Sequence, residues 1–286
     1  MPERALRLAV LQTDARPRDV TGNLDRLAAM ATATGAELTL TPELSVTGYG
    51  VSDDAATLAV PLRTGAAAPP SWAAASAAPG TLVLGAIERG VDGLPYNVAA
   101  ALADGAVGAV QRKIYLPTYG TFDEGRFFAR GRTVTPWTLT GGWRAGVLVC
   151  EDLWHPGLAY ALAAQDIHLL LVLSAAPGRG AWEGSAAGGL FASAEPWEHL
   201  ARAAAHAYGV YVALANRCGV EGGVTFAGGS LVVAPDGALL ARAPELEQAA
   251  LEVELDPAAL RAARRPWSHF RDDDPALVRR ALEALP

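Results

Sequence analysis

Residues 145–174 read AGVLVCEDLWHPGLAYALAAQDIHLLLVLS, and the fold class can be inferred from them. The two ends of this stretch, 145–150 and 168–173, are continuous runs of mainly apolar residues, the pattern of strands that are buried on both faces. Residues 157–165 between them read as a helix, and parallel strands need a crossover connection of this kind. The stretch therefore predicts a β-α-β unit within an α/β fold.

The same alternation of strands and helices continues along the rest of the chain. Residues 5–12 predict a strand, residues 23–34 a helix that ends at Gly35, and residues 37–41 a second strand. Asp104-Gly105 and Asp236-Gly237 are dipeptides that favour tight turns between antiparallel strands. The remaining predictions are strands at 81–87, 96–103, 106–112 and 210–215, a hairpin at 230–241, helices at 196–208 and 275–285, and a surface helix or loop in the Ala-rich patch 66–78. Since no Pro- or Ser-rich linker divides the chain, we expect a single domain over residues 1–286.

Composition excludes several classes of function. The 286 residues are 51% hydrophobic and 19% charged, which is typical of a globular protein. The net charge of −7 and the lack of a basic cluster argue against a nucleic-acid partner. No apolar run approaches the roughly 18 residues that span a bilayer, so we expect no membrane association and a cytoplasmic location. In that reducing compartment, Cys150 and Cys218 are expected to stay unpaired.

Three side chains that can carry chemistry follow predicted strands, where α/β folds place reactive groups. Glu43 follows the strand 37–41, Lys113 follows the strand 106–112, and Cys150 is the last residue of an apolar run. Each has an ordinary explanation when it is considered alone: a surface carboxylate, a surviving lysine or an inert buried thiol. Lys113 is unusual because the other 22 of the 23 basic residues are Arg. A compact ammonium is therefore a candidate for a role that a planar guanidinium cannot fill.

Taken together, the segments PELSVTGY, RKIYLPTYGTFDEGRFFARG and VLVCEDLWHP resemble the three catalytic blocks of the nitrilase, or carbon-nitrogen hydrolase, superfamily. Further segments resemble the family at YNVAA, LSAAP, ARAAAHAYGVYVALANRCG and FAGGSLVVAPDG, so that the resemblance covers about residues 5 to 275. It implies a Glu43-Lys113-Cys150 triad in which Cys150 attacks an amide carbonyl, Glu43 moves the proton and Lys113 neutralises the oxyanion together with the backbone N–H of Glu151. Glu124 corresponds to a second glutamate of the family, which positions the substrate amide and bonds the lysine.

The CEDLW form around the cysteine is similar to the glutaminase domain of glutamine-dependent NAD synthetases. This similarity implies substrate-binding roles for Tyr119, Glu151, Trp154, Ser174 and, less directly, Arg179. An anionic and a cationic side chain would suit the ammonium and carboxylate groups of an α-amino acid. The length of 286 residues and the lack of a phosphate-binding Gly-rich loop favour a freestanding amidase over a synthetase.

The fold that the resemblance implies is an α-β-β-α sandwich, with two mixed sheets between helix layers and the site at the strand ends. The implied activity is cysteine-dependent hydrolysis of a non-peptide C–N bond in a small amide, such as glutamine or another ω-amide, through a thioester and with release of ammonia. The alternatives are hydrolysis of an N-carbamoyl amine or acid and a catalytically silent binding subunit. No metal or organic cofactor is implied. The expected partner is a second copy of the chain, in a homodimer or higher homo-oligomer. The ammonia is either released or passed to a separate, unidentified partner enzyme.

Overall fold

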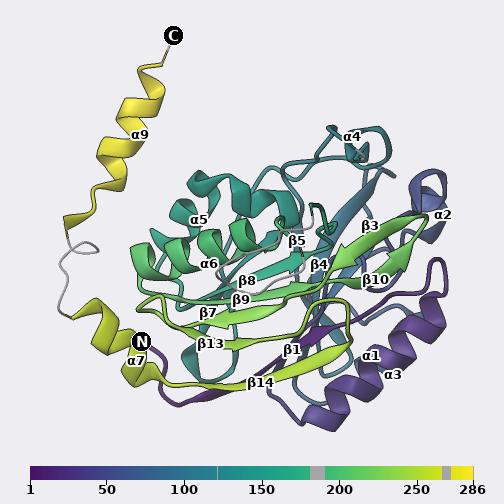
Figure 1. Cartoon of the computed structure of the whole chain (residues 1–286), viewed down its shortest axis with the longest axis horizontal. Helices are drawn as coiled ribbons and strands as arrows, with labels where there is room; N and C mark the ends of the chain where they lie inside the picture. The colour runs from purple at the N-terminus through teal and green to yellow at the C-terminus, as the bar shows by residue number, and fades with distance from the viewer. Residues whose placement is uncertain (121, 181–190, 266–271, 286) are drawn as a thin grey trace.

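The chain folds into two six-stranded mixed sheets that pack face to face between layers of helices (Figure 1). The computed structural model describes residues 1–120, 122–180, 191–265 and 272–285. The layers form the α-β-β-α arrangement that the sequence resemblance implies.

The first sheet has the strand order β14-β1-β2-β3-β4-β5. Its centre is parallel, because β1 pairs with β2 and β2 with β3 in the same direction, whereas β14, β4 and β5 run antiparallel to their neighbours. The turn at Asp104-Gly105 joins β4 to β5 as expected, with both residues at positive φ. The strands are β1 (Leu6–Gln12), β2 (Leu38–Leu40), β3 (Thr81–Arg89), β4 (Pro95–Ala103), β5 (Ala106–Arg112) and β14 (Ala249–Leu255).

The second sheet has the order β13-β12-β9-β8-β7-β6 and a similar plan. The strands β7, β8 and β9 are parallel, and β6 and the β12-β13 hairpin flank them in antiparallel pairing. The β-α-β unit predicted at residues 145–174 is β7, α5 and β8. The strands are β6 (Trp137–Thr138), β7 (Arg144–Val149), β8 (Leu169–Ser174), β9 (Tyr211–Asn216), β12 (Leu231–Val233) and β13 (Leu239–Arg242).

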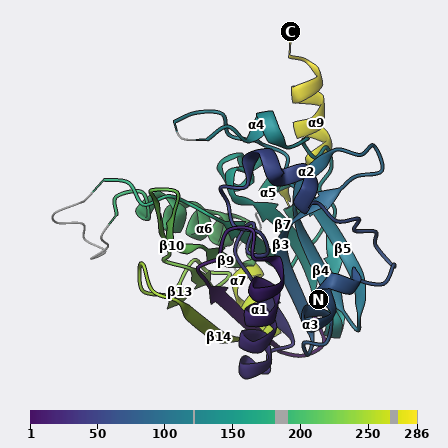
Figure 2. The same ribbon diagram turned by 90° about the vertical axis from the view of Figure 1, so that its right-hand side faces the viewer.

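Alternating side chains of each strand divide between the two faces of its sheet. In β3, Val83 joins the core between the sheets, while Leu82 and Leu84 belong to the outer core under the helices. The helices α1 (Val20–Thr34) and α3 (Ala73–Ser76) cover this outer face of the first sheet (Figure 2). The helices α5 (Pro156–Ala163) and α6 (Glu195–Tyr208) cover the second sheet (Figure 1). Because side chains alternate along each strand, one face of a sheet packs on the other sheet and the opposite face packs under helices.

Several predicted boundaries need correction. The first helix begins at Val20, three residues before the predicted start, because Asp19 caps it through the N–H of Gly22. The Ala-rich patch 66–78 is not wholly on the surface, since Trp72 and Ala75 within it are buried. Local sequence patterns did not predict β14, the edge strand β6, the hairpin of β10 (Cys218–Glu221) and β11 (Val224–Ala227), or the short helices α2 (Ala55–Leu58), α4 (Glu124–Phe127) and α7 (Pro257–Arg264).

The C-terminal helix α9 (Pro275–Glu283) has Asp274 as its N-cap, as predicted, and ends two residues before the expected position. Among the described residues, no helix has the length and apolar character needed to cross a membrane.

Candidate active site

Glu43, Lys113 and Cys150 converge at one end of the sandwich. Glu43 lies just beyond β2, and Lys113 immediately follows β5, both in the first sheet. Cys150 immediately follows β7 in the second sheet. The three residues are 0%, 0% and 7% exposed, so the site lies inside the protein between the ends of both sheets.

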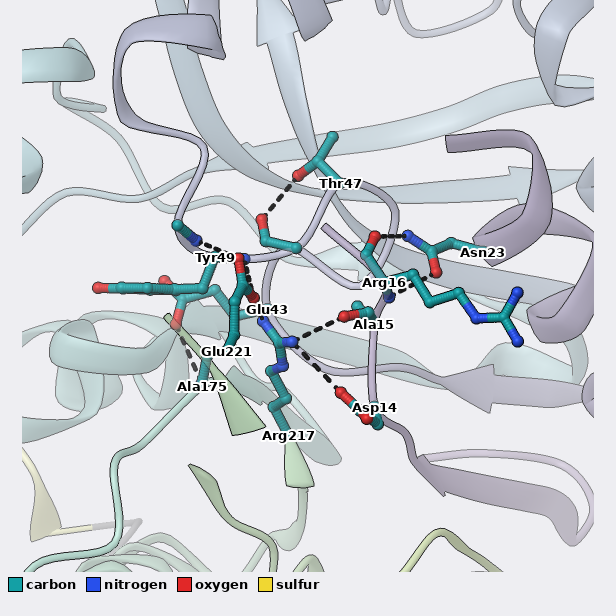
Figure 3. A network of polar contacts seen from close by, with 12 residues as sticks. Asp14, Ala15, Arg16, Asn23, Glu43, Thr47, Tyr49, Ala175, Arg217 and Glu221 are labelled. Carbon is teal, nitrogen blue, oxygen red and sulfur yellow. Dashed lines mark hydrogen bonds and ion pairs between the residues drawn. The ribbon is translucent and has the colours of Figure 1, made fainter. Parts of the chain in front are cut away.

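Lys113 links two buried carboxylates. Its Nζ donates to Oε1 of Glu43 at 2.7 Å and to Oε1 of Glu124 at 2.7 Å. Glu43 also accepts hydrogen bonds from the side-chain amide of Asn97 at 2.8 Å and from the backbone N–H of Ala175 at 3.1 Å, the second of which is drawn in Figure 3. Each oxygen of Glu43 therefore has a fixed partner, and its carboxylate is held in one orientation.

The turn that carries Glu43 depends on the absence of a side chain at Gly85 in β3. A Cβ at Gly85 would lie 2.2 Å from the carbonyl oxygen of Pro42 and 2.5 Å from the nitrogen of Leu44. Leu44 has a φ of 49°, a left-handed conformation that is uncommon for a residue with a branched side chain. The backbone of β3 must approach this turn closely, and only glycine permits the approach.

Cys150 begins a 3-10 turn (Cys150–Trp154) in a left-handed conformation, with a φ of 49°. Strained backbone of this kind is common at functional sites. Its Sγ lies 3.5 Å from the hydroxyl of Ser174, which follows from the alignment of β7 with β8.

Asp152 connects the cysteine turn to the segment after Lys113. Its Oδ1 accepts the backbone N–H groups of Ile114 and Tyr115 at 3.0 and 2.8 Å, and its Oδ2 accepts the N–H of Val149. Burial raises the pKa of Asp152 to about 6, although these N–H donors oppose the shift. The side chain therefore sets the spacing between the lysine and the cysteine.

The electrostatics of the site favour a charged lysine beside a neutral thiol. Burial alone would lower the pKa of Lys113, but the carboxylates of Glu124 and Glu43 outweigh burial and raise it well above its ordinary value. Burial and then the negative charge of Glu43 raise the pKa of the Cys150 thiol. The pKa of Glu124 is raised to about 7, mainly by burial and against the attraction of Lys113. The thiol must therefore lose its proton to a base before it can attack.

Tyr49 completes the polar cluster. Its hydroxyl donates to Oε1 of Glu124, the oxygen that Lys113 also contacts. The other oxygen of Glu124, Oε2, is buried and has no hydrogen-bond partner among the described residues. Both residues line a pocket of about 330 Å³ together with Phe122, Pro177 and Phe226. A hydrogen-bond acceptor is thus available beside a pocket whose lining is partly aromatic and partly charged.

The residues predicted to bind substrate do not form one continuous group. The Tyr119 hydroxyl donates to Oε2 of Glu151 at 2.8 Å, and both residues line a pocket of about 730 Å³ with His155. Ser174 lies next to Cys150, as described above. The guanidinium of Arg179 lies over the ring of Phe122, 5.6 Å from its centroid. Trp154 is 42% exposed and packs edge-to-face against Trp197 of α6.

Three residues that hold the site together were missed by sequence reasoning. Asn97 belongs to the segment YNVAA, and Tyr49 and Asp152 belong to the first and third of the segments that resemble catalytic blocks, but no individual role was predicted for any of the three. A polar residue on an otherwise apolar strand was the available signal for Asn97, since buried polar groups need partners. Cys218, which the sequence analysis expects to stay unpaired, is a buried free thiol in β10.

Among the described residues, no group of three or more His, Cys, Asp or Glu side chains is arranged to hold a metal ion. Of the five histidines, which are possible metal ligands, His269 lies outside the described residues. The site as described consists of a buried thiol, an ammonium and two carboxylates.

Comparisons with known proteins identify the family of this chain. Residues 7–265 match the carbon-nitrogen hydrolase family. The chain is 32% identical over 280 residues to a protein of Pseudomonas protegens named "Hydrolase in pqqF 5'region", covering 96% of this chain and 91% of that protein. It is 31% identical over 261 residues to the glutamine-dependent NAD(+) synthetase of Thermotoga maritima, covering 88% of this chain but only 42% of the synthetase.

Solved structures that are similar to this chain include a double mutant of the amidase from Nesterenkonia sp. AN1 in complex with acrylamide. It is 29% identical, with a TM-score of 0.75, and the superposition covers 96% of this chain and 97% of the amidase. The family match spans most of the sequence, and the fold agrees with it. The chain therefore belongs to the carbon-nitrogen hydrolase family.

Proposed function

We propose that this protein hydrolyses the C–N bond of a small linear amide through a thioester on Cys150 and releases ammonia. The observation that carries the proposal is the buried ammonium of Lys113, which contacts Glu43 and Glu124 at 2.7 Å each beside the cysteine turn. Burying charged groups at such cost is typical of functional sites.

In the first half of the reaction, Glu43 takes the proton of the Cys150 thiol as the sulfur attacks the carbonyl carbon. Lys113 and the backbone N–H of Glu151 stabilise the oxyanion of the tetrahedral intermediate. Glu43 then gives the proton to the departing nitrogen, the C–N bond breaks, and ammonia and a thioester remain. The unpartnered Oε2 of Glu124 is suited to accept a hydrogen bond from the substrate amide.

In the second half, Glu43 takes a proton from water, and the resulting hydroxide attacks the thioester carbonyl. The C–S bond breaks, the carboxylic acid leaves, and the thiol regains its proton from Glu43. One carboxylate thus serves both half-reactions, which explains why its orientation is fixed by Asn97 and Ala175.

The proposed substrates are glutamine-like or other ω-amides. Glu151 supports this choice because its carboxylate lies at the pocket with Tyr119, where it could receive an α-ammonium group. The similarity to NAD synthetases, named for their dependence on glutamine, also supports it. The Nesterenkonia amidase, which was solved with acrylamide, supports simpler amides. An N-carbamoyl amine or acid is the alternative, since the same groups would act on a ureido carbonyl.

Ammonia release from a panel of glutamine, simple aliphatic amides, N-carbamoyl compounds and nitriles tests the proposal. We expect one amide class to be hydrolysed by the wild type and none by Cys150→Ala. A panel that the wild type leaves intact would favour a silent binding subunit instead.

Substrate recognition is tested by Glu151→Gln on glutamine and on the amide that lacks the α-amino group. If the carboxylate binds the ammonium, the preference for glutamine should shrink by about fivefold, the scale of roughly 1 kcal/mol in a solvent-accessible pocket. The oxyanion donor at this position is a backbone N–H, so the desamino amide should still be hydrolysed. Equal losses on both substrates would show that Glu151 has a structural role through Tyr119.

The proposal also includes a cytoplasmic location and a homodimer or higher homo-oligomer, with the ammonia either released or passed to a separate partner enzyme. Analytical ultracentrifugation of the purified chain measures its homo-oligomeric state directly. A monomer at micromolar concentration would contradict it.

A further inference from the structure

A second buried ionic cluster lies next to the amide-hydrolysis site (Figure 3). Arg217, between β9 and β10, is 1% exposed. Its guanidinium pairs with Glu221 and with Asp14 at 3.4 Å, donates to the carbonyl of Ala15 at 2.7 Å, and lies over the ring of Phe226. Glu221 is therefore held in place by a residue that cannot itself move freely.

Glu221 binds the backbone of the loop that follows Glu43. Its two carboxylate oxygens accept the N–H groups of Tyr49 at 3.0 Å and of Gly50 at 2.7 Å. The preceding residue, Gly48, has a φ of 82°, and a Cβ there would lie 2.9 Å from the Cα of Pro17. The Glu221 carboxylate thus binds the loop directly after Gly48, where the backbone conformation and the nearby Pro17 leave no room for a side chain.

The same loop delivers a side chain to the catalytic centre. The Tyr49 ring packs edge-to-face against Phe122 at 6.3 Å and Phe226 at 5.7 Å, and its hydroxyl donates to Oε1 of Glu124. Lys113 contacts this oxygen as well. A chain of direct contacts therefore runs from Arg217 through Glu221 and the loop to the lysine.

We propose that Glu221 is a positioning residue for the hydrolysis: by holding the backbone at Tyr49 and Gly50, it places the Tyr49 hydroxyl on Glu124 and so fixes Lys113 between its two carboxylates. The role rests on the proposed amide hydrolysis at Cys150. If Tyr49 withdrew, Glu124 would keep Lys113 as its sole partner at Oε1, and the ammonium would shift away from Glu43 and from the oxyanion. Glu221 has no contact with the reacting atoms in this account and acts through Tyr49.

The kinetic test compares Glu221→Gln, Tyr49→Phe and the double variant on a hydrolysed amide. A glutamine has a single acceptor oxygen and no charge, so it cannot serve both N–H groups and Arg217. We expect kcat to fall about tenfold or more in each single variant, with a smaller change in KM. The kcat of the double variant should fall no further than that of the slower single variant, because both substitutions remove the same contact, the hydrogen bond from Tyr49 to Glu124.

The pH profile separates positioning from general destabilisation. The Tyr49 hydroxyl favours the ionised form of Glu124, whose pKa is about 7, so its loss should raise that pKa. The acidic limb of kcat/KM should then move to higher pH in Glu221→Gln and in Tyr49→Phe. The matched control is Glu198→Gln on α6, which removes ion pairs with Arg202 and Arg242 away from the site. This control should leave kcat and the limb unchanged.

Hydrogen exchange at Tyr49 and Gly50 tests the backbone contact without any substrate. Exchange of these two amides should be faster in Glu221→Gln than in the wild type and unchanged in Glu198→Gln. Additive losses in the double variant, or wild-type kcat in Glu221→Gln despite faster exchange, would overturn the positioning role. A wild type that hydrolyses no amide would instead overturn the proposed function. Independently of any activity, unchanged exchange of the Tyr49 and Gly50 amides in Glu221→Gln would show that the Glu221 side chain does not hold this backbone.

Discussion

The thiol of Cys150 is buried, and its raised pKa keeps it protonated until a substrate arrives. A neutral thiol attacks poorly, so the proton must pass to a neighbouring base as the carbonyl is approached. Glu124 and Glu43 raise the pKa of Lys113, so the proposed mechanism has a charged ammonium in place to stabilise an oxyanion. In the proposed mechanism, Glu43 transfers the proton and Lys113 stabilises the negative charge.

Lys113→Arg preserves the positive charge and tests whether its position matters. The guanidinium is wider and spreads its charge over three nitrogens, so it cannot contact both carboxylates from one point. We expect kcat to fall by about two to three orders of magnitude, the scale of losing an oxyanion donor. Arg202→Lys, on the outer helix α6, is the reciprocal control and should keep wild-type turnover. Near-normal rates in Lys113→Arg would mean that the lysine has no role in turnover.

The convergence of Glu43, Lys113 and Cys150 was predictable because each combines a reactive group with a position after a strand, in segments that resemble a family. The residues that support them were less predictable. Asn97 lies within a strand of apolar residues, and its contact with Glu43 joins positions 54 residues apart. Asp152 is charged and next to the nucleophile, yet it contacts backbone groups 37 and 38 residues earlier. Such contacts depend on the tertiary fold, which local patterns do not encode.

The strand β3 and the turn after β2 form a unit that orients Glu43. Gly85→Ala would place a methyl group 2.2 Å from the carbonyl oxygen of Pro42, and backbone on both sides leaves little room to adjust. We expect a loss of about 1–3 kcal/mol in the free energy of unfolding and a fall in kcat as Glu43 moves. Gly108→Ala in β5 is the control, because the nearest atom to its added Cβ is 3.8 Å away. Equal melting temperatures for the two variants would contradict this account.

The buried strands were predicted well, whereas the edges of the sheets were not. The strands β7 and β8 are short and apolar except for Arg144 at the start of β7 and Ser174 at the end of β8, which their sequence shows directly. The strand β14 alternates exposed glutamates with apolar residues, and its partner β1 lies at the opposite end of the chain. Its pairing depends on the closure of a very long loop. The first turn of α1 was missed because Val20, Thr21 and Gly22 have weak helix propensity.

The whole protein has one lysine, and the packing of both sheets buries it completely. An amine-reactive reagent should therefore label the native protein only at its N-terminal amine, because the ammonium of Lys113 is both inaccessible and charged. After denaturation, a second label should appear on the peptide that contains Lys113. Mass spectrometry of the two samples counts the labels. Rapid labelling of Lys113 in the native protein would show that the two sheets do not enclose the site.

Ammonia release from a hydrolysed amide by the cysteine variants decides whether Cys150 carries the acyl group. Cys150→Ala should release no ammonia above background while keeping the wild-type circular dichroism spectrum. Cys218→Ala, which removes the other buried thiol, should retain most of the activity. Peptide mapping of acid-quenched wild type during turnover should find the acyl group on Cys150 alone. Ammonia release by Cys150→Ala at the wild-type rate, or equal losses in both variants, would contradict the account.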